Sequence, residues 1–122
     1  MAPSQIEFGK RIRELREAKR KTDPAFSLRR FAQAVGISAT FLSKVETGDS
    51  LPPSADKVKR MAKLLETDAD ELLALAGKVD PMLSEIIREM PRAMADFLRT
   101  AREEGLTNID IERLTRSIKK KR

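Results

Sequence analysis

Two short segments with apolar side chains at helical spacing, joined by a very short connection, constrain this fold more than any other feature. The first covers residues 28–35, and Leu42 and Val45 belong to the second. Gly36 can adopt the left-handed conformation that ends a helix, and Ser38 is placed to cap the next helix. We therefore expect two short helices that meet at a sharp angle.

The composition favours packed amphipathic helices over strands. Aromatic residues make up 4% of the chain and charged residues 36%. Leu, Ile, Ala and Met supply most of the apolar side chains, as in helical domains. A length of 122 residues allows one main hydrophobic core and an appendage. The sequence therefore predicts an all-α protein.

Caps, glycines and prolines predict the other helices. The first is expected over residues 6–20, because Pro24 disfavours a helical residue before it. The Pro-Pro pair after Gly48 requires a loop. Later helices are expected to start at Ser54, Asp68, Pro81, Pro91 and Asn108. We expect a DNA-binding domain at 1–78, a helical dimerisation or partner segment at 79–118 and a basic tail at 119–122.

The outer face of the helix after Ser38 carries only side chains that are not bulky. With Leu42 and Val45 directed inward, the residues on this face are Ala39, Thr40, Ser43 and Lys44. Such a face can enter a DNA major groove without holding the backbone away. Lys44 can reach O6 and N7 of guanine, and the two hydroxyls can donate or accept. We expect these four residues to read bases.

The start of the preceding helix is expected to face a phosphate. Ser27 offers a hydroxyl, and the backbone amides that follow it point out of the helix N-terminus, which attracts anions. Arg29, Arg30 and Gln33 can assist. The residues expected at the DNA backbone in these two helices are Ser27, Leu28, Arg29, Arg30, Gln33, Ser38 and Thr47.

Residues 8–76 resemble the Cro/repressor-type helix-turn-helix regulators, also called the xenobiotic-response-element family. The resemblance lies in "FGKRIRELRE", "FAQAVGISATFLSKVETG" and "PPSADKVKRMAKLLETDADELLALAG". It implies a five-helix, lambda-repressor-like domain that binds operator DNA as a dimer with its third helix in the major groove. It also implies a structural pair between Arg16 and Glu46, and backbone contacts around Gly48 and Ser54.

Two segments depart from the family pattern. The connector "KTDPAF" is longer than the usual turn between the first two helices. In "DSLPP", Asp49 stands where many relatives place a basic residue near the phosphates. The acidic side chain of Asp49 disfavours backbone contact after the recognition helix.

An apolar stripe rich in methionine follows Pro81, and it has two interpretations. It can pack on its own domain, or it can form a homodimer or partner interface, because Met surfaces adapt to varied partners. We favour the homodimer. The stripe consists of Met82, Leu83, Ile86, Ile87, Met90, Met94, Phe97 and Leu98.

The composition also argues against several function classes. Without His or Cys, the chain lacks the commonest general base and metal ligand and any thiol chemistry. We expect no catalysis, metal or cofactor, because Asp68, Asp70 and Glu71 fit helix-start charges. The N-terminus lacks a signal-peptide core, and no apolar run can span a membrane, so a cytoplasmic protein is expected.

The expected function is sequence-specific DNA binding by a transcriptional regulator, a repressor at a palindromic operator. The net charge of +6 fits a polyanionic partner. The alternative is a protein-interaction module, such as an antitoxin whose C-terminal helices mask a toxin. The apolar stripe fits both interpretations.

Overall fold

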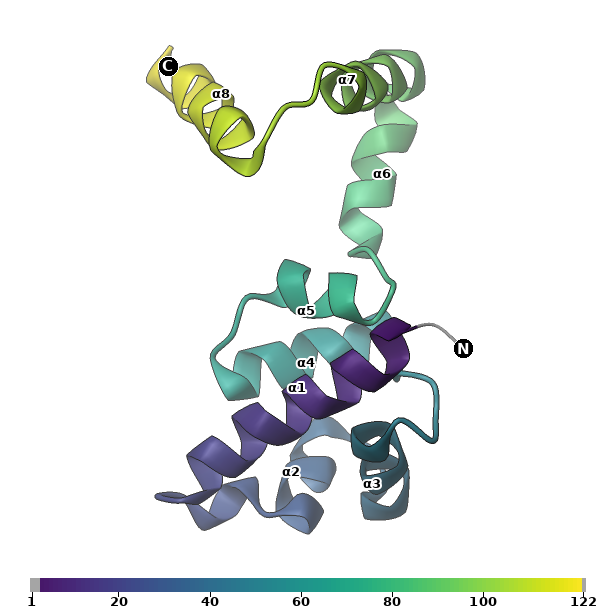
Figure 1. Ribbon diagram of the computed structural model, residues 1–122, viewed down its shortest axis with the longest axis vertical. Helices are drawn as coiled ribbons and strands as arrows, with labels where there is room; N and C mark the ends of the chain where they lie inside the picture. The colour runs from purple at the N-terminus through teal and green to yellow at the C-terminus, as the bar shows by residue number, and fades with distance from the viewer. Residues whose placement is uncertain (1–2, 122) are drawn as a thin grey trace. The chain divides into compact units, whose positions relative to one another are not determined.

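The computed structural model describes residues 3–121, and within them every regular element is helical. This confirms the all-α prediction. Two units follow one another, the first ending at Pro81 and the second beginning at Met82 (Figure 1). The elements are α1 (Pro3–Arg20), the 3-10 helix η1 (Pro24–Phe26), α2 (Leu28–Val35), α3 (Ala39–Thr47), α4 (Ala55–Leu65), α5 (Ala69–Leu75), α6 (Pro81–Glu89), α7 (Pro91–Glu103) and α8 (Asn108–Lys120).

Serine caps start α2, α3 and α4 as predicted. The Oγ atoms of Ser27, Ser38 and Ser54 each accept a hydrogen bond from the backbone amide three residues later, at 3.3, 3.0 and 3.4 Å. Each bond satisfies one amide that the helix itself leaves unpaired. At the other end of α2, Gly36 takes the expected left-handed conformation, with φ of 91°. The turn between α2 and α3 is therefore fixed by local interactions.

The long connector between α1 and α2 folds into η1 and packs against the domain. Asp23 caps η1 by accepting a hydrogen bond from the amide of Ala25 at 2.9 Å. The Phe26 ring stacks on Phe31 with ring centroids 5.9 Å apart, and Lys19 Nζ lies 5.6 Å from its centroid. The longer connector is thus accommodated as an ordered turn.

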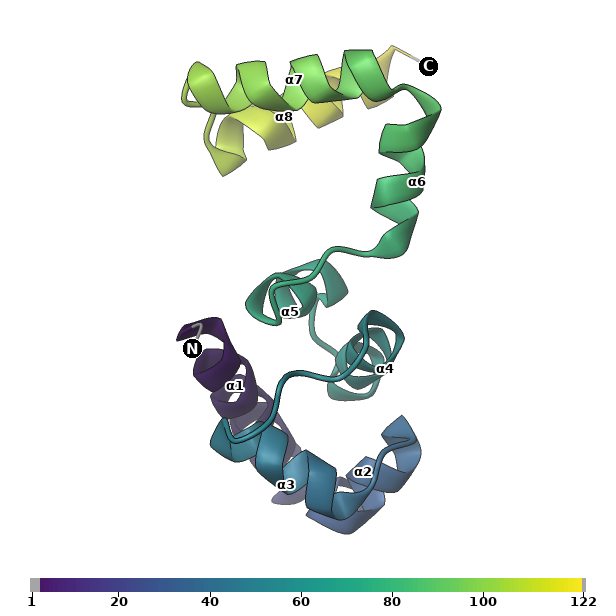
Figure 2. The ribbon, with the colours of Figure 1, turned by 90° about the vertical axis from the view of Figure 1, so that its right-hand side faces the viewer.

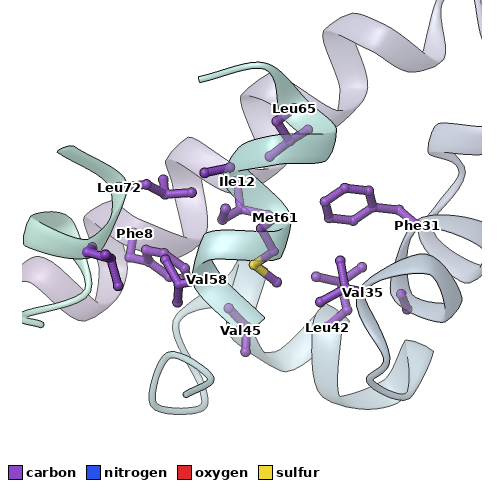
Figure 3. Packing of buried hydrophobic residues seen from close by; sticks show 13 residues of the cluster. Phe8, Ile12, Phe31, Val35, Leu42, Val45, Val58, Met61, Leu65 and Leu72 are labelled. Atoms are coloured by element: carbon purple, nitrogen blue, oxygen red, sulfur yellow. The ribbon is translucent and has the colours of Figure 1, made fainter. Parts of the chain in front are cut away.

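The five helices of the first unit surround one hydrophobic core. Each packs against the next in the order α1, α3, α2, α4, α5 and back to α1, as Figure 2 shows. Figure 3 shows the buried side chains meeting between these helices. The core consists of Phe8, Ile12, Phe31, Ala32, Val35, Leu42, Val45, Val58, Met61, Ala62, Leu65, Leu72 and Leu73.

The second unit contains three short helices and, among its described residues, no buried side chain. Its helices begin at the predicted Pro81, Pro91 and Asn108, and α8 has a capping box between Thr107 and Asp110. Helix α8 continues through Lys119 and Lys120, which were expected in the basic tail, because cations are favourable at a helix C-terminus. Arg122 of that tail, and residues 1 and 2 of the expected first domain, lie outside the described residues.

Candidate nucleic-acid interface

Helix α3 lies unusually close to α1, because Gly9 has no side chain. A Cβ added at Gly9 would overlap the carbonyl oxygen of Val45 and lie 3.1 Å from the carbonyl carbon of Glu46. These are backbone atoms of α3, so they cannot move aside as the end of a side chain can. Gly9 therefore fixes the distance between α1 and α3.

A buried ion pair ties α3 to α1 about two turns after Gly9. Arg16 Nε and Nη2 donate to the two carboxylate oxygens of Glu46 at 2.7 and 2.9 Å, and Arg16 Nη1 donates to the Phe26 carbonyl at 3.0 Å. The residues expose only 4% and 8% of their surface. The hydrogen bond that Arg16 donates to the Glu46 carboxylate raises the pKa of Arg16, and this effect outweighs the opposite effect of burial. This confirms the pair that the family resemblance implied.

Three of the four predicted base-reading side chains lie exposed on α3. They are Thr40, Ser43 and Lys44. The fourth, Ala39, is partly buried and packs against the core, so it offers less surface than the helical spacing suggested. Phe41 is also only partly buried on α3, and the sequence analysis did not consider it. The exposed face of α3 is thus short, polar and singly charged.

The predicted phosphate contacts at the helix starts keep a hydrogen to donate. Ser27, Ser38 and Ser54 use an oxygen lone pair as the cap acceptor, and a serine hydroxyl has one hydrogen besides. The first amides of α2, including that of Leu28, have no acceptor inside the helix. Arg29, Arg30 and Gln33 are exposed beside them. The start of α2 can therefore bind an anion with several donors.

Thr47 differs from these residues, because its hydroxyl is engaged within the chain. Thr47 Oγ1 lies 2.9 Å from Asp49 Oδ2 and within 3.2 Å of the carbonyl oxygens of Ser43 and Lys44. The hydroxyl has one hydrogen, which one of these acceptors takes. A carboxylate beside it repels phosphate. The geometry therefore disfavours Thr47 as a phosphate donor.

A groove of about 280 Å³ lies between α1, the start of α2 and α3. Arg13 and Arg20 of α1 share its lining with Leu28 at the start of α2 and with Ser43 and Thr47 of α3. The sequence analysis did not include either arginine among the candidate site residues. Their spacing gives a signal, because positions 13, 16 and 20 fall on one face of a helix. The groove thus gathers arginines and hydroxyl groups from α1 and α3 together with the carboxylates of Glu17 and Glu46. Glu17 pairs with Arg20 at 3.3 Å, so Arg13 is the less encumbered of the two cations.

The apolar stripe of the second unit remains exposed in the chain. Met82, Met90 and Phe97 expose 65%, 51% and 52% of their surface. Leu83, Ile86 and Leu98 are also exposed, and Ile87 and Met94 are partly buried. These residues lie on two helices, since the backbone bends at Met90 between α6 and α7. Most side chains of this stripe are therefore exposed among the described residues.

Residues 3–121 show neither a metal-binding cluster nor a membrane-spanning helix. That stretch contains no cluster of three or more His, Cys, Asp or Glu residues able to hold a metal ion. None of its helices combines the length and apolar character that crossing a bilayer requires.

Comparison with known proteins agrees with this geometry. A family model described as a helix-turn-helix domain matches residues 7–75, more than half of the chain. The chain is 29% identical over 106 residues to the uncharacterized HTH-type transcriptional regulator RghRB of Bacillus subtilis, covering 85% of this chain and 73% of that protein. No solved structure gave a significant match.

Two shorter matches concern only the first unit. The HTH-type regulator YazB of Bacillus subtilis is 40% identical over 65 residues, covering 53% of this chain and 86% of YazB. Rv0474 of Mycobacterium tuberculosis, also named an HTH-type regulator, is 36% identical over 63 residues, which are 52% of this chain and 44% of Rv0474. The chain therefore belongs to the helix-turn-helix domain family and is a DNA-binding transcriptional regulator.

Proposed function

We propose that this regulator is a cytoplasmic, sequence-specific repressor that binds a two-fold symmetric operator as a homodimer. The observation that carries this proposal is the exposed face of α3, where Thr40, Ser43 and Lys44 project from a helix held by Gly9 and the buried Arg16–Glu46 pair. A rigidly held helix loses little freedom on binding, so its contacts favour affinity and specificity.

In this proposal α3 enters the major groove with its N-terminal half toward the base edges. Lys44 donates to O6 and N7 of a guanine, and Thr40 and Ser43 donate to or accept from neighbouring bases. The methyl group of Ala39, although partly buried, touches a thymine methyl at the edge of the groove. The two α3 helices of a dimer then read half-sites about one helical turn, ~34 Å, apart.

The phosphates on either side of α3 are held by two groups of donors. The first is the start of α2, with Ser27, the following amides, Arg29 and Arg30. The second is the α1 edge of the groove, with Arg13 and Arg20. These contacts set the position of the protein on the duplex, whereas α3 supplies the sequence preference. A dimer on an operator that overlaps a promoter represses by occupying it.

The test is selection of bound sequences from a random duplex library with the full chain. A palindromic motif with half-sites about 10 base pairs apart supports the proposal. Lys44→Ala should relax the preference at one base pair in each half-site by about 1 to 3 kcal/mol. Lys63→Ala is the matched control, because Lys63 is exposed on α4, away from α3.

Two outcomes would contradict the proposal. If Lys44→Ala selects the same bases as the parent chain, Lys44 does not read a base. If the full chain enriches no motif, DNA recognition is secondary, and the partner-binding alternative, such as an antitoxin, takes its place. An adjacent toxin-like reading frame would point the same way.

A further inference from the structure

The second unit has amphipathic helices but no core of its own among its described residues. Each of α6, α7 and α8 has an apolar stripe, and none contributes a buried side chain. The stripe of α8, formed by Ile111, Leu114 and Ile118, was not included in the predicted partner surface. These three residues expose 43%, 44% and 68% of their surface. The unit thus presents two exposed apolar surfaces among its described residues, one on α6–α7 and one on α8.

These helices need a partner, because they are too short to be stable alone. They contain 9, 13 and 13 residues, and isolated helices below about 12 to 15 residues are marginal in water. No two of them pack broadly against each other in the single chain. A stable interface buries about 800 Å² on each partner. Ten large apolar side chains between Met82 and Ile118 are exposed, and together they provide a surface of about this area.

The charges of this unit are divided along the chain. Residues 82–112 contain four basic and seven acidic residues, a net charge of −3, whereas residues 113–122 contain six basic residues and no acidic one, a net charge of +6. Helical spacing places Glu85 and Glu89 along one edge of the α6 stripe, and Lys119 and Lys121 on the two edges of the α8 stripe. One chain thus carries both halves of a complementary pair.

We propose that α8 of one copy packs along the α6–α7 stripe of a second copy, with Lys119 and Lys121 beside Glu85 and Glu89. This deepens, and rests on, the homodimer of the proposed function. A two-fold dimer repeats each contact, so both apolar surfaces of both chains are covered at once. The opposite charges favour a second copy over an unrelated partner, because a single sequence supplies both sides of the interface.

Exchange of the charges between two chains tests this pairing. One variant carries Lys119→Glu and Lys121→Glu, and the other carries Glu85→Lys and Glu89→Lys. Each homodimer then places like charges together, which should weaken self-association about tenfold or more at low salt. In an equimolar mixture the opposite charges meet again, so a heterodimer should form with nearly the parent affinity. Analytical ultracentrifugation of the full chains without DNA measures both.

A matched control separates position from charge. Arg116→Glu with Lys120→Glu makes the same change of charge on the opposite face of α8, and should leave the dimer intact. Thermal unfolding followed by circular dichroism checks that the first unit stays folded in every variant. The chain contains no cysteine, so one introduced cysteine per variant gives a single labelling site. Energy transfer between a donor on one variant and an acceptor on the other then verifies the heterodimer.

Three results would overturn the proposal. In the first, the mixture of the two variants stays dissociated, whereas a single chain that carries all four substitutions associates. That result would mean that α8 packs on the stripe of its own chain. If the control weakens the dimer equally, only net charge matters. If the parent chain is monomeric at micromolar concentration, no second copy covers the stripe. DNA selection reports separately on the proposed function, because a chain that fails here can still enrich a half-site.

Discussion

Replacement of Gly9 by alanine should destabilise the first unit, although the same change stabilises most helices. Gly9 lies inside α1, where Ala is favoured over Gly by roughly 0.5 to 1 kcal/mol. Here, however, the added Cβ would overlap the Val45 carbonyl oxygen. Because α3 backbone atoms form the obstacle, α1 and α3 must move apart and loosen the core around Phe8 and Val45.

The two effects have opposite signs, and the steric one is larger. Overpacking a close-packed core costs typically about 1 to 3 kcal/mol, and this contact is at the severe end because backbone must move. After the gain in helix propensity, we expect a net loss of about 2 kcal/mol. In a domain of 60 to 100 residues each kcal/mol shifts Tm by about 4 to 8 °C. A decrease in Tm of roughly 8 to 16 °C should follow.

Urea unfolding followed by circular dichroism measures the change in free energy of unfolding. Ala18→Gly is the matched control, because Ala18 is exposed in the same helix and reports propensity alone. It should cost about 1 kcal/mol. Gly9→Ala should also weaken selection between operator sequences, since α3 shifts relative to α2. An increase in stability of about 1 kcal/mol for Gly9→Ala would refute the close-approach argument.

Three further predictions concern the ion pair, the groove and the last helix. Glu46→Ala should lower the free energy of unfolding by about 3 to 5 kcal/mol, because Arg16 stays buried without its carboxylate partner. The double variant Arg16→Met with Glu46→Leu should recover most of this loss, because it removes both buried charges. Urea unfolding of the single and double variants measures both changes. Arg13→Ala and Arg20→Ala should weaken binding to all duplexes alike and each lower the slope of log affinity against log salt by about 0.9; an unchanged slope would remove both from the DNA contact. The amide and hydroxyl of Thr107 donate hydrogen bonds to Asp110 and lower the pKa of its carboxyl below the ordinary value of 3.8. The ionised carboxylate therefore stabilises α8 above about pH 4, and this stabilisation is lost as the pH falls through the folded-state pKa. Helical ellipticity should show this loss in the parent chain and not in Asp110→Asn.

Much of the helical pattern could be predicted because helix ends are local. Ser27, Ser38 and Ser54 cap amides only three residues away, and the end of α2 needs only the left-handed conformation of Gly36. The exposure of Thr40 and Lys44 followed from helical spacing in the same way. The Arg16–Glu46 pair, separated by 30 positions, was accessible only through the family resemblance.

The sequence by itself determined which segments form the α-helices, most of their ends, and which face of α3 is polar. It misplaced the start of α1, which is Pro3, and the end of α8, which is Lys120. The tertiary structure decided what lies beside that face: Gly9 against Val45, the arginines of α1 beside Ser43, and the partial burial of Ala39. It also left most side chains of the α6–α8 apolar stripes exposed, with Ile87 and Met94 partly buried. The physical reason is that caps and periodicity act within a few residues, whereas packing depends on backbone distances between segments far apart in sequence.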